Sequence, residues 1–299
     1  MSYFFIINPK AGKRVGDIKA RIAAFFSERR VLCELEFTRA RDHATELAAR
    51  ALLSGFTRIV AVGGDGTIRE TASALIGKEA ALGILPCGSG NGLARNLYIP
   101  LGFDAALRGL ADWEPRTIDA GLANGAPFFC AAGAGLDGEV AHDFNSMTGR
   151  RGILPYVWHA ARRVIAYKPR KVTAIVDGRS FELDGIINSV LNGVQYGGGA
   201  KMAPGAYIDD GMLDLVSIKK APLPRLLAAL PALFSGRLAE YPAIYSARKG
   251  RIIELRCGPG VWYHLDGEDF YSEDGNIKFS VFPSALRVLA PKPSLAENL

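Results

Sequence analysis

The sequence predicts an α/β domain followed by a β-rich domain. Up to about residue 110, short apolar runs alternate with longer helical segments, the pattern of parallel strands joined by crossover helices. After about residue 115 the apolar runs follow one another closely, and Asp177-Gly178 favours a two-residue hairpin turn between antiparallel strands. A length of 299 residues agrees with two domains, at about 150 residues for each.

The first domain is expected to hold a parallel sheet with helices on both faces, because its strands read as continuous apolar runs. The expected elements are a strand at 3–7, a helix at 17–29, a strand at 31–37, a helix at 43–53, a strand at 58–62, a helix from Thr67 and a strand at 82–85. We place the end of this domain near residue 120, so that it spans residues 1–120.

The second domain, residues 121–290, is expected to consist mainly of antiparallel strands, and residues 291–299 form a C-terminal tail. Strands are expected at 171–176, 181–183, 185–191, 213–218, 252–256, 261–265 and 277–281, with helical segments near 153–167 and 223–235. The chain shows no internal repeat and no low-complexity tract.

Charge and cysteine content narrow the class of protein. The formal net charge of +6 suits an anionic partner but does not choose among phosphate, nucleic acid and an acidic membrane surface. The four cysteines lie far apart without CxxC spacing, so neither a zinc site nor a disulfide framework is expected. This use of cysteine favours a cytoplasmic location. The N-terminal run reads as a strand rather than a signal peptide. No apolar stretch reaches the roughly 20 residues that a transmembrane helix requires.

A first glycine cluster, Gly63-Gly64-Asp65-Gly66-Thr67, comes directly after an apolar strand and before a helical segment. In an open parallel sheet this is the edge where ligands bind, and the N-terminus of a helix there offers N–H groups to a phosphate. An acidic side chain beside a polyphosphate needs a cation between them, so Asp65 indicates Mg²⁺. The alternative is a glycine-rich turn in which Asp65 caps the helix.

A second cluster, Pro86-Cys87-Gly88-Ser89-Gly90-Asn91-Gly92, also follows a strand and precedes a helical segment. Two such loops on one sheet should lie side by side. The side chains of Ser89 and Asn91 can offer hydroxyl and amide groups to a phosphate or a ribose. A capping turn remains the alternative for this segment.

The sequence excludes several other catalytic and nucleotide-binding motifs, because residues that they require are missing. Asn8 to Arg14 is not a Walker A loop, since the upstream glycine is missing and Arg14 replaces the Ser or Thr that binds Mg²⁺. Gly133 to Gly138 matches GxGxxG, but no strand ending in an acidic residue follows about 20 positions later, as a dinucleotide fold requires. The four histidines lack metal-ligand spacing, and no GxSxG motif is present.

Carboxylates are crowded in His264-Leu265-Asp266-Gly267-Glu268-Asp269, at the end of an expected strand. Repulsion among them can raise a carboxyl pKa and produce a general base, or a cation can relieve it. An acidic hairpin turn is the alternative. Asp209-Asp210-Gly211 is likewise either a turn or a cation site.

Taken in order, these segments resemble the diacylglycerol kinase catalytic family of soluble bacterial lipid kinases, which is related to the sphingosine kinases and NAD kinases. The resemblance covers about residues 5 to 270. It is carried by Asn8-Pro9 with Gly12, Gly63-Gly64-Asp65-Gly66-Thr67, Leu85-Pro86, Gly88-Ser89-Gly90-Asn91, Asn192-Gly193, Tyr196-Gly197-Gly198-Gly199, Ala203-Pro204-Gly205, Asp209-Asp210-Gly211 and Asp266-Gly267-Glu268.

By this resemblance, a three-layer α/β domain binds ATP, a β-sandwich-like domain follows, and the active site lies in the cleft between them. The implied activity is ATP- and Mg²⁺-dependent phosphate transfer to a hydroxyl of a diacylglycerol-like or sphingoid lipid. The implied nucleotide contacts are Asn8, Thr38, Gly63, Gly64, Asp65, Gly66, Thr67, Ile68, Arg69, Gly88, Ser89 and Asn91. Asp65 lies near the Mg²⁺, and the proton acceptor is Glu268, with Asp266 beside it as the other candidate. A structural cation is implied at the Asp210 side chain with the Tyr207 and Met212 carbonyls.

Two positions depart from the family pattern: Arg69 stands where Asn is usual, and Gly92 where many diacylglycerol-type members have Asp. The alternatives are an NAD kinase-like enzyme and a non-catalytic nucleotide or lipid sensor. The expected partner is a lipid substrate, met by peripheral contact with an anionic inner membrane surface. Basic residues between Arg150 and Lys171 are the expected contact face. No nucleic-acid partner is expected, and a homodimer is left open.

Overall fold

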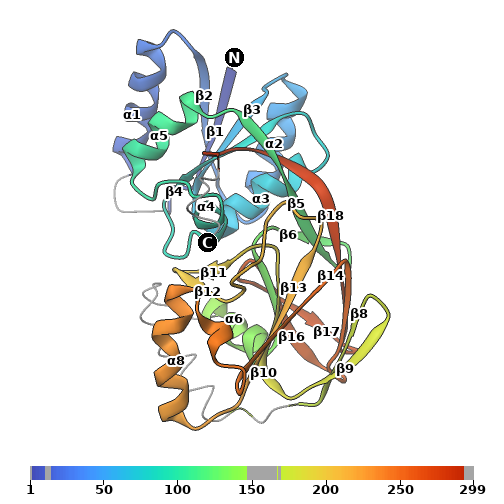
Figure 1. Ribbon diagram of the computed structural model, residues 1–299. Helices are drawn as coiled ribbons and strands as arrows, with labels where there is room; N and C mark the ends of the chain where they lie inside the picture. The colour runs from blue at the N-terminus through green and yellow to red at the C-terminus, as the bar shows by residue number, and fades with distance from the viewer. Residues whose placement is uncertain (1, 11–14, 147–166, 168–169, 293–299) are drawn as a thin grey trace. The chain divides into compact units, whose positions relative to one another are not determined.

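The computed structural model describes residues 2–10, 15–146, 167 and 170–292. The chain divides into two units: unit 1 contains residues 1–118 and 284–299, and unit 2 contains residues 119–283 (Figure 1). The first division falls within strand β5 (Pro115–Ala123), and the second falls within strand β18 (Asn276–Leu289).

Unit 1 is built on a parallel sheet with the strand order β2-β1-β3-β4-β18. Its other strands are β1 (Ser2–Ile7), β2 (Leu32–Phe37), β3 (Arg58–Gly63) and β4 (Ala81–Pro86). All residues of β3 and β4 are buried, as expected for central strands covered on both faces, whereas β2 at the edge is partly exposed.

Five helices accompany the sheet in the described part of unit 1: α1 (Val15–Glu28), α2 (His43–Leu53), α3 (Asp65–Leu75), α4 (Gly92–Asn96) and α5 (Phe103–Asp112). Successive residues of β1 show that both faces of the sheet are covered. The ring of Phe5 packs on Phe26 of α1, while the ring of Phe4 packs on Phe56, which follows α2. Figure 1 likewise draws α1 and α5 on one side of the sheet and α2 and α3 on the other.

Unit 2 is a sandwich of two sheets. One has the order β14-β13-β10-β7-β16-β17, and the other contains β15, β8 and β9 with the first part of β18. The strands besides β5 and β18 are β6 (Ala126–Phe128), β7 (Ala131–Gly135), β8 (Val172–Val176), β9 (Arg179–Leu183), β10 (Gly185–Leu191), β11 (Gln195–Gly197), β12 (Ala200–Lys201), β13 (Leu213–Lys219), β14 (Tyr245–Gly250), β15 (Ile252–Arg256), β16 (Val261–Leu265) and β17 (Glu268–Ser272). One core cluster joins the sheets, with Val190, Leu215 and Leu265 from the first and Ala174 and Leu255 from the second.

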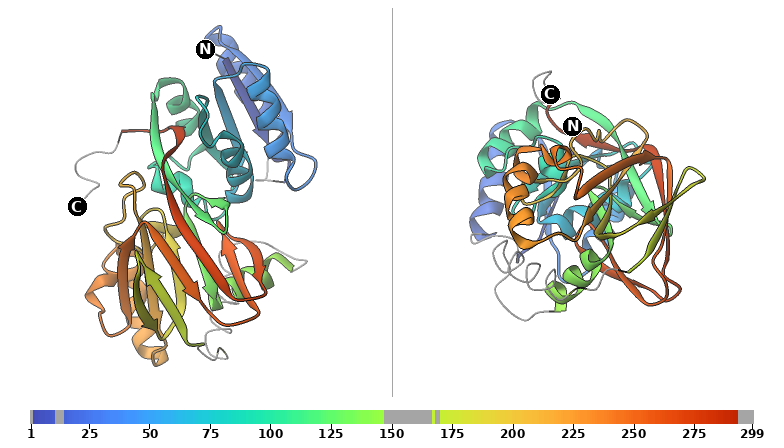
Figure 2. Two further views of the ribbon diagram at one scale, coloured as in Figure 1. Left: turned by 90° about the vertical axis from the view of Figure 1, so that its right-hand side faces the viewer. Right: turned by 60° about the horizontal axis from the view of Figure 1, so that its bottom comes forward.

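Two helices of unit 2, α6 (Leu136–Ser146) and α8 (Leu223–Ser235), lie outside this core, and the 3-10 helix η1 (Leu238–Glu240) follows α8 (Figure 2). The fold class expected from the sequence is thus confirmed. The β8–β9 hairpin turns at Asp177 and Gly178, whose positive φ angles of 45° and 82° suit the two-residue turn expected there. The helical segment expected near 153–167 lies almost wholly outside the described residues.

The last strand differs from the expectation that residues 121–290 form the second domain. β18 is longer than the strand expected at 277–281, and residues 284–290 belong to unit 1. Here Arg287 and Val288 pair in parallel with Ala81 and Leu82 of β4, and the N–H of Gly77 donates to the Ala285 carbonyl. The pairing gives β4 a neighbour on its otherwise open edge.

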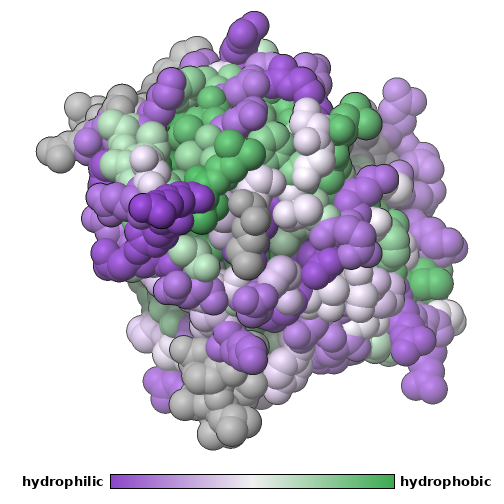
Figure 3. Space-filling view, turned by 90° about the horizontal axis from the view of Figure 1, so that it is seen from above, coloured by the Kyte–Doolittle hydropathy of each residue, from purple (hydrophilic) through white to green (hydrophobic). Residues whose placement is uncertain are grey.

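The surface mixes hydrophilic and hydrophobic residues. On the face seen in Figure 3, hydrophilic residues surround a hydrophobic area. Single exposed apolar side chains are ordinary on folded proteins, so only a grouping on one element calls for an explanation. Among the residues that the structure describes, no helix is both long and apolar enough to cross a membrane.

Candidate functional site

The expected nucleotide-binding residues of unit 1 all come at the carboxyl ends of parallel strands. Asn8 follows β1, Thr38 follows β2, residues 63–69 run from β3 into α3, and residues 88–91 follow β4. Because β1 to β4 are parallel, these four segments emerge at one edge of the sheet, the edge where open α/β sheets bind ligands.

The two glycine loops touch through their backbones. A Cβ on Gly88 would lie 2.6 Å from the Cα of Gly64, so neither position has room for a side chain without a shift of backbone. A Cβ on Gly63 would likewise lie 2.7 Å from the Oγ1 of Thr67. The same Thr67 hydroxyl accepts a hydrogen bond from Asn8 Nδ2 at 3.0 Å, which joins the end of β1 to the first loop. The expected side-by-side placement of the loops is therefore what the structure has.

Asp65 joins the two loops. Its Oδ2 accepts the N–H of Asn91 at 2.9 Å and its Oδ1 accepts the N–H of Gly92 at 2.7 Å. Burial raises the pKa of Asp65, against the opposing effect of these two N–H groups. The helix-cap alternative is thus met in an unexpected form, because the Asp65 carboxylate accepts the N–H groups of Asn91 and Gly92 at the N-terminus of α4.

The other expected nucleotide contacts differ in exposure. Thr38 and Ile68 are buried, and the N–H of Thr38 donates to the Ile7 carbonyl at 2.9 Å. Ser89 is exposed at the tip of the second loop, and Arg69 is partly buried in α3. The side chain of Asn91 is folded back onto its own loop, since it accepts from the N–H of Gly88 and donates to the Gly88 carbonyl. Ser89 is therefore better placed than the Asn91 side chain to meet a ligand.

The donor set at these loops fits a magnesium ion that arrives with phosphates. Mg²⁺ usually takes one or two protein carboxylates and fills its other positions with water and substrate phosphate oxygens. Asp65 supplies one carboxylate, at the point where the two loops meet. In the described part of the chain, no group of three or more His, Cys, Asp or Glu side chains could hold a metal by itself.

The acidic segment of unit 2 forms the turn between β16 and β17. Asp266 and Gly267 have positive φ angles of 49° and 88°, and Leu265 pairs with Glu268 across the hairpin. Asp266 accepts three backbone N–H groups: Phe129 at 2.8 Å on Oδ2, and Cys130 at 2.9 Å and Ala131 at 3.0 Å on Oδ1. Its carboxylate therefore anchors the turn to the chain entering β7.

The neighbouring carboxylates have different surroundings. Asp269 accepts hydrogen bonds from Asn145 at 2.9 Å and from the His142 ring at 2.7 Å. Burial would raise the pKa of Asp269, but these hydrogen bonds outweigh it and lower that pKa. Glu268 is partly exposed at the start of β17. Asp266 and Asp269 both accept hydrogen bonds that hold the hairpin.

A buried polar network that sequence reasoning missed lies beside this turn. Asp137, at the start of α6, accepts hydrogen bonds from Ser189 at 2.6 Å and Tyr196 at 2.5 Å, and the Tyr196 hydroxyl is 2.6 Å from His264 Nε2. His264 Nδ1 accepts the N–H of Gly267 at 3.3 Å, which places the ring proton on Nε2, facing the Tyr196 oxygen. Polar residues inside apolar strands, Ser189 in β10 and His264 in β16, were the available signal.

This network stabilises an ionised carboxylate inside the protein. Burial would raise the pKa of Asp137, but the His264 ring and the Ser189 and Tyr196 hydroxyls lower it below its ordinary value. A Cβ on Gly133 would lie 1.9 Å from Asp137 Oδ2, so this strand position must be glycine for the carboxylate to fit. Through Gly267, the network supports the turn that carries Glu268.

We expect Tyr196→Phe to lower the free energy of unfolding by about 1–3 kcal/mol, because Asp137 loses one buried donor and His264 Nε2 keeps only its direct contact with Asp137 Oδ2 at 3.2 Å. Urea denaturation followed by circular dichroism measures the change. The control is Tyr271→Phe, at an exposed tyrosine of β17, with an expected change within about 0.5 kcal/mol. Equal losses in the two variants would contradict a stabilising role for the network.

The residues expected to hold a structural cation are adjacent, but a lysine lies among them. Asp210 Oδ1 accepts the N–H of Met212 at 3.0 Å, and Asp210 Oδ2 is 2.7 Å from Lys249 Nζ. The ammonium also lies 3.5 Å from Asp214, where burial raises the pKa to about 6 against the attraction of Lys249. A cation at Tyr207, Asp210 and Met212 would have to displace Lys249, and this assignment stays a prediction.

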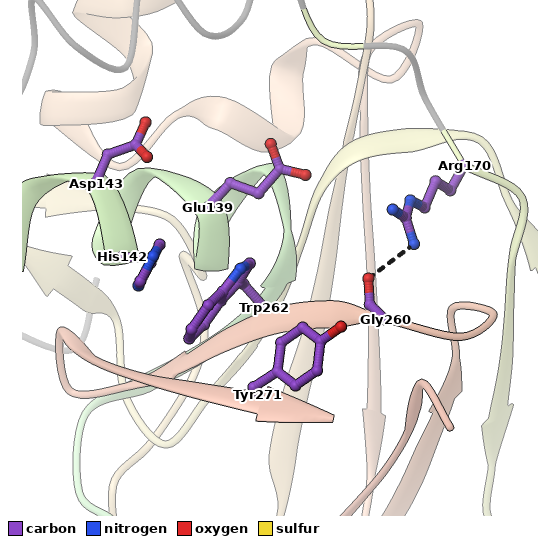
Figure 4. A pocket seen from close by; sticks show the side chains of 7 residues that line it. All are labelled: Glu139, His142, Asp143, Arg170, Gly260, Trp262 and Tyr271. Carbon is purple, nitrogen blue, oxygen red and sulfur yellow. Dashed lines mark hydrogen bonds between the residues drawn. The ribbon is translucent and has the colours of Figure 1, made fainter. Parts of the chain in front are cut away.

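Unit 2 also contains a pocket of about 360 Å³ beside α6 and the β16–β17 hairpin (Figure 4). The rings of His142 and Trp262 stack with centroids 3.6 Å apart, and Arg170 donates to the Gly260 carbonyl at 3.1 Å. The lining residues are Glu139, His142, Asp143, Arg170, Gly260, Trp262 and Tyr271. His142 links this pocket to the hairpin, because the same ring binds Asp269 next to Glu268.

Comparisons with known proteins agree with this arrangement. Residues 2–123 match the family described as "Diacylglycerol kinase catalytic domain", and residues 130–290 match "YegS C-terminal NAD kinase beta sandwich-like domain". A Pseudomonas aeruginosa protein named "Probable lipid kinase YegS-like" is 34% identical over 95% of this chain and 93% of its own length. A Bacillus subtilis protein named "Diacylglycerol kinase" is 30% identical over 88% of both chains.

A solved structure titled as a diacylglycerol kinase from Bacillus anthracis has the same fold, with a TM-score of 0.75, 18% sequence identity and 97% coverage of both chains. At that identity the likeness concerns the fold alone. The family assignment depends instead on the matches to both units and on the sequence relatives. The chain belongs to the diacylglycerol kinase catalytic domain family, whose members are phosphotransferases, and it carries the YegS-type C-terminal domain.

Proposed function

We propose that the protein is a lipid kinase that transfers the γ-phosphate of ATP, with Mg²⁺, to a hydroxyl of a diacylglycerol-like or sphingoid lipid. The observation that carries the proposal is the pair of glycine loops in backbone contact where β3 and β4 end, joined by Asp65. The family and the names of the relatives support phosphate transfer to a lipid.

The loops of unit 1 are suited to hold phosphates. The first turn of α3 leaves N–H groups without partners inside the helix, and the glycines before it let a phosphate oxygen approach the backbone. Asn8 donates to the Thr67 hydroxyl and orients it in the first turn of α3. Bound Mg²⁺ would neutralise charge on the transferring phosphate, and Asp65 is the carboxylate that would hold it.

Proton transfer falls to Glu268 in this proposal. A bond forms between the lipid oxygen and the γ-phosphorus, the bond from that phosphorus to the ADP oxygen breaks, and the hydroxyl proton needs an acceptor. The Asp266 carboxylate accepts three backbone N–H groups that hold it against the chain entering β7, and the family resemblance gives Glu268, two residues along the same turn, as the other candidate. Asp266 is therefore a positioning residue, and Glu268 is the base.

Transfer of labelled γ-phosphate from ATP with Mg²⁺ tests the proposal. The acceptors are diacylglycerol, monoacylglycerol, phosphatidylglycerol, ceramide and sphingosine in mixed micelles, with NAD as a comparison. We expect label on at least one lipid and none on NAD. Label on NAD alone supports the NAD kinase-like alternative, and nucleotide binding without label on any acceptor supports the sensor.

Contact with a membrane belongs to the same proposal, since the acceptor is a lipid. We infer a peripheral contact with an anionic surface, favoured by the net charge of +6. Most of the basic residues expected to make it, between Arg150 and Lys171, lie outside the described residues. The cytoplasmic location and the lack of a nucleic-acid partner stay predictions. Whether the protein forms a homodimer stays open.

A further inference from the structure

Helix α8 is apolar on the face that packs against unit 2. Ala229 and Ala232 are buried. Ala229 belongs to a second core cluster of unit 2 that also contains Val216 of β13, and Leu226 and Leu233 pack against this cluster. The Tyr241 hydroxyl donates to the Ala228 carbonyl and ties the helix to the segment after it. This inner face accounts for the attachment of α8 to the domain.

The outer face of α8 is apolar as well. Leu227, Leu230 and Phe234 are 54%, 44% and 50% exposed, and their spacing of three and four residues aligns them in one stripe. The other large exposed hydrophobic residues of the described chain occur singly on their helices, strands or loops. Figure 2 draws α8, in orange, at the outside of unit 2.

A helix that is apolar on all sides is normally buried. The described part of the chain covers only one side of α8, so the outer stripe calls for a partner outside it. Between the stripe residues the exposed positions are Ala228 and Pro231, which offer no side-chain hydrogen bond. A protein interface usually carries about one hydrogen bond per 100–200 Å², and this face has few groups to make them.

The charged side chains within the α8 segment of the sequence are all basic. Residues 219–237 include Lys219, Lys220, Arg225 and Arg237 and no acidic residue. Lys219 pairs with Asp184, and Lys220 donates to the Tyr167 carbonyl. Arg225 and Arg237 are exposed near the two ends of the stripe. An apolar stripe flanked by cations is complementary to a bilayer with anionic headgroups, in whose interface an amphipathic helix lies flat.

We propose that the outer face of α8 docks the enzyme on an anionic lipid bilayer, with Leu227, Leu230 and Phe234 inserted among the acyl chains and Arg225 and Arg237 at the headgroups. The inference rests on the proposed function, since a lipid acceptor resides in a bilayer. It names a surface that the charge pattern of the sequence did not indicate.

Vesicle flotation without ATP tests this surface in the full chain. The vesicles contain equal parts of phosphatidylglycerol and phosphatidylcholine, and the variant carries Leu230→Gln with Phe234→Gln, replacements that keep helix propensity nearly unchanged. We expect roughly a tenfold or greater loss of vesicle partitioning, because two apolar side chains no longer insert. The control is Leu53→Gln in unit 1, where a leucine 91% exposed at the end of α2 should leave partitioning unchanged.

A second variant, Arg225→Gln with Arg237→Gln, should lose partitioning on anionic vesicles and keep it on phosphatidylcholine alone. Unfolding midpoints of all variants establish that they fold. Partitioning of the stripe variant equal to that of the unchanged chain overturns the inference. So does a loss of self-association in gel filtration with vesicle binding intact, since the stripe then faces a second copy of this chain.

The failure of this inference is distinguishable from that of the proposed function. Phosphate transfer to a short-chain lipid dispersed as monomers measures catalysis without docking. If the stripe variant keeps this transfer and loses vesicle binding, both proposals hold. Vesicle binding through α8 without transfer to any lipid overturns the kinase alone. If the enzyme transfers phosphate to a lipid and the stripe variant binds vesicles as well as the unchanged chain, the docking surface alone is overturned.

Discussion

Glu268→Gln should lower kcat for phosphate transfer to lipid by about 10²–10⁴-fold, the usual contribution of a positioned general base. Glutamine keeps the size of the side chain but cannot accept the hydroxyl proton. Because Glu268 is partly exposed at the start of β17, the midpoint of unfolding should change little. Initial rates at saturating ATP and lipid measure the effect.

The matched control is Glu273→Gln, an exposed acid in the turn after β17 of the same unit, for which normal turnover is expected. Asp266→Asn tests the positioning role of Asp266 separately from the proposed base, Glu268. Asparagine would turn an NH₂ group toward one of the three N–H donors, and the free energy of unfolding should fall by about 1–3 kcal/mol. Near-normal kcat in Glu268→Gln, together with a stable but inactive Asp266→Asn, would move the base to Asp266.

Asp65→Asn should lower kcat/KM for MgATP by about 10²–10³-fold, the size seen when one preorganised electrostatic contact is lost. The change removes the negative charge that we propose to bind Mg²⁺. It also sets an NH₂ group against one of the two N–H donors that join the loops, Asn91 and Gly92. Rates measured across a range of Mg²⁺ concentrations should show the larger part of the loss at low Mg²⁺.

The fold of this variant should survive. Burial raises the pKa of Asp65, so the ionised carboxylate carries a desolvation cost that neutral asparagine avoids, and this offsets part of the lost hydrogen bonding. Asp112→Asn, at an exposed acid that ends α5, is the control with unchanged kinetics. An Asp65→Asn enzyme with ordinary kcat/KM at low Mg²⁺ would contradict the assignment of Asp65 to the metal.

Several parts of the candidate site follow from local sequence. The two glycine clusters after apolar strands predicted neighbouring loops at one sheet edge, and Gly64 and Gly88 do touch. Asp177-Gly178 predicted a tight turn and forms one. These predictions succeed because strand, turn and helix patterns repeat over a few residues, and because parallel strands bring their carboxyl ends to one edge.

The partners of the acidic residues could not be predicted in the same way. Asp65 appeared as a cap or a metal ligand for its own loop, yet it binds Asn91 and Gly92 of the second loop. Asp266 appeared beside Glu268 as the second candidate for the base, yet it accepts N–H groups from residues 129–131, more than 130 positions earlier. Each carboxylate's role depends on which donors the folded chain brings to it.

The sequence by itself determined the order of domains, the parallel sheet of unit 1 and its glycine loops, because these depend on short-range periodicity and on turn chemistry. Only the tertiary structure decided that β18 returns to β4 and that Asp137, Tyr196 and His264 form one network. It also decided that α8 packs one apolar face on the described part of unit 2 and exposes Leu227, Leu230 and Phe234 on the other. These features arise from contacts between residues far apart in the chain, which no local pattern records.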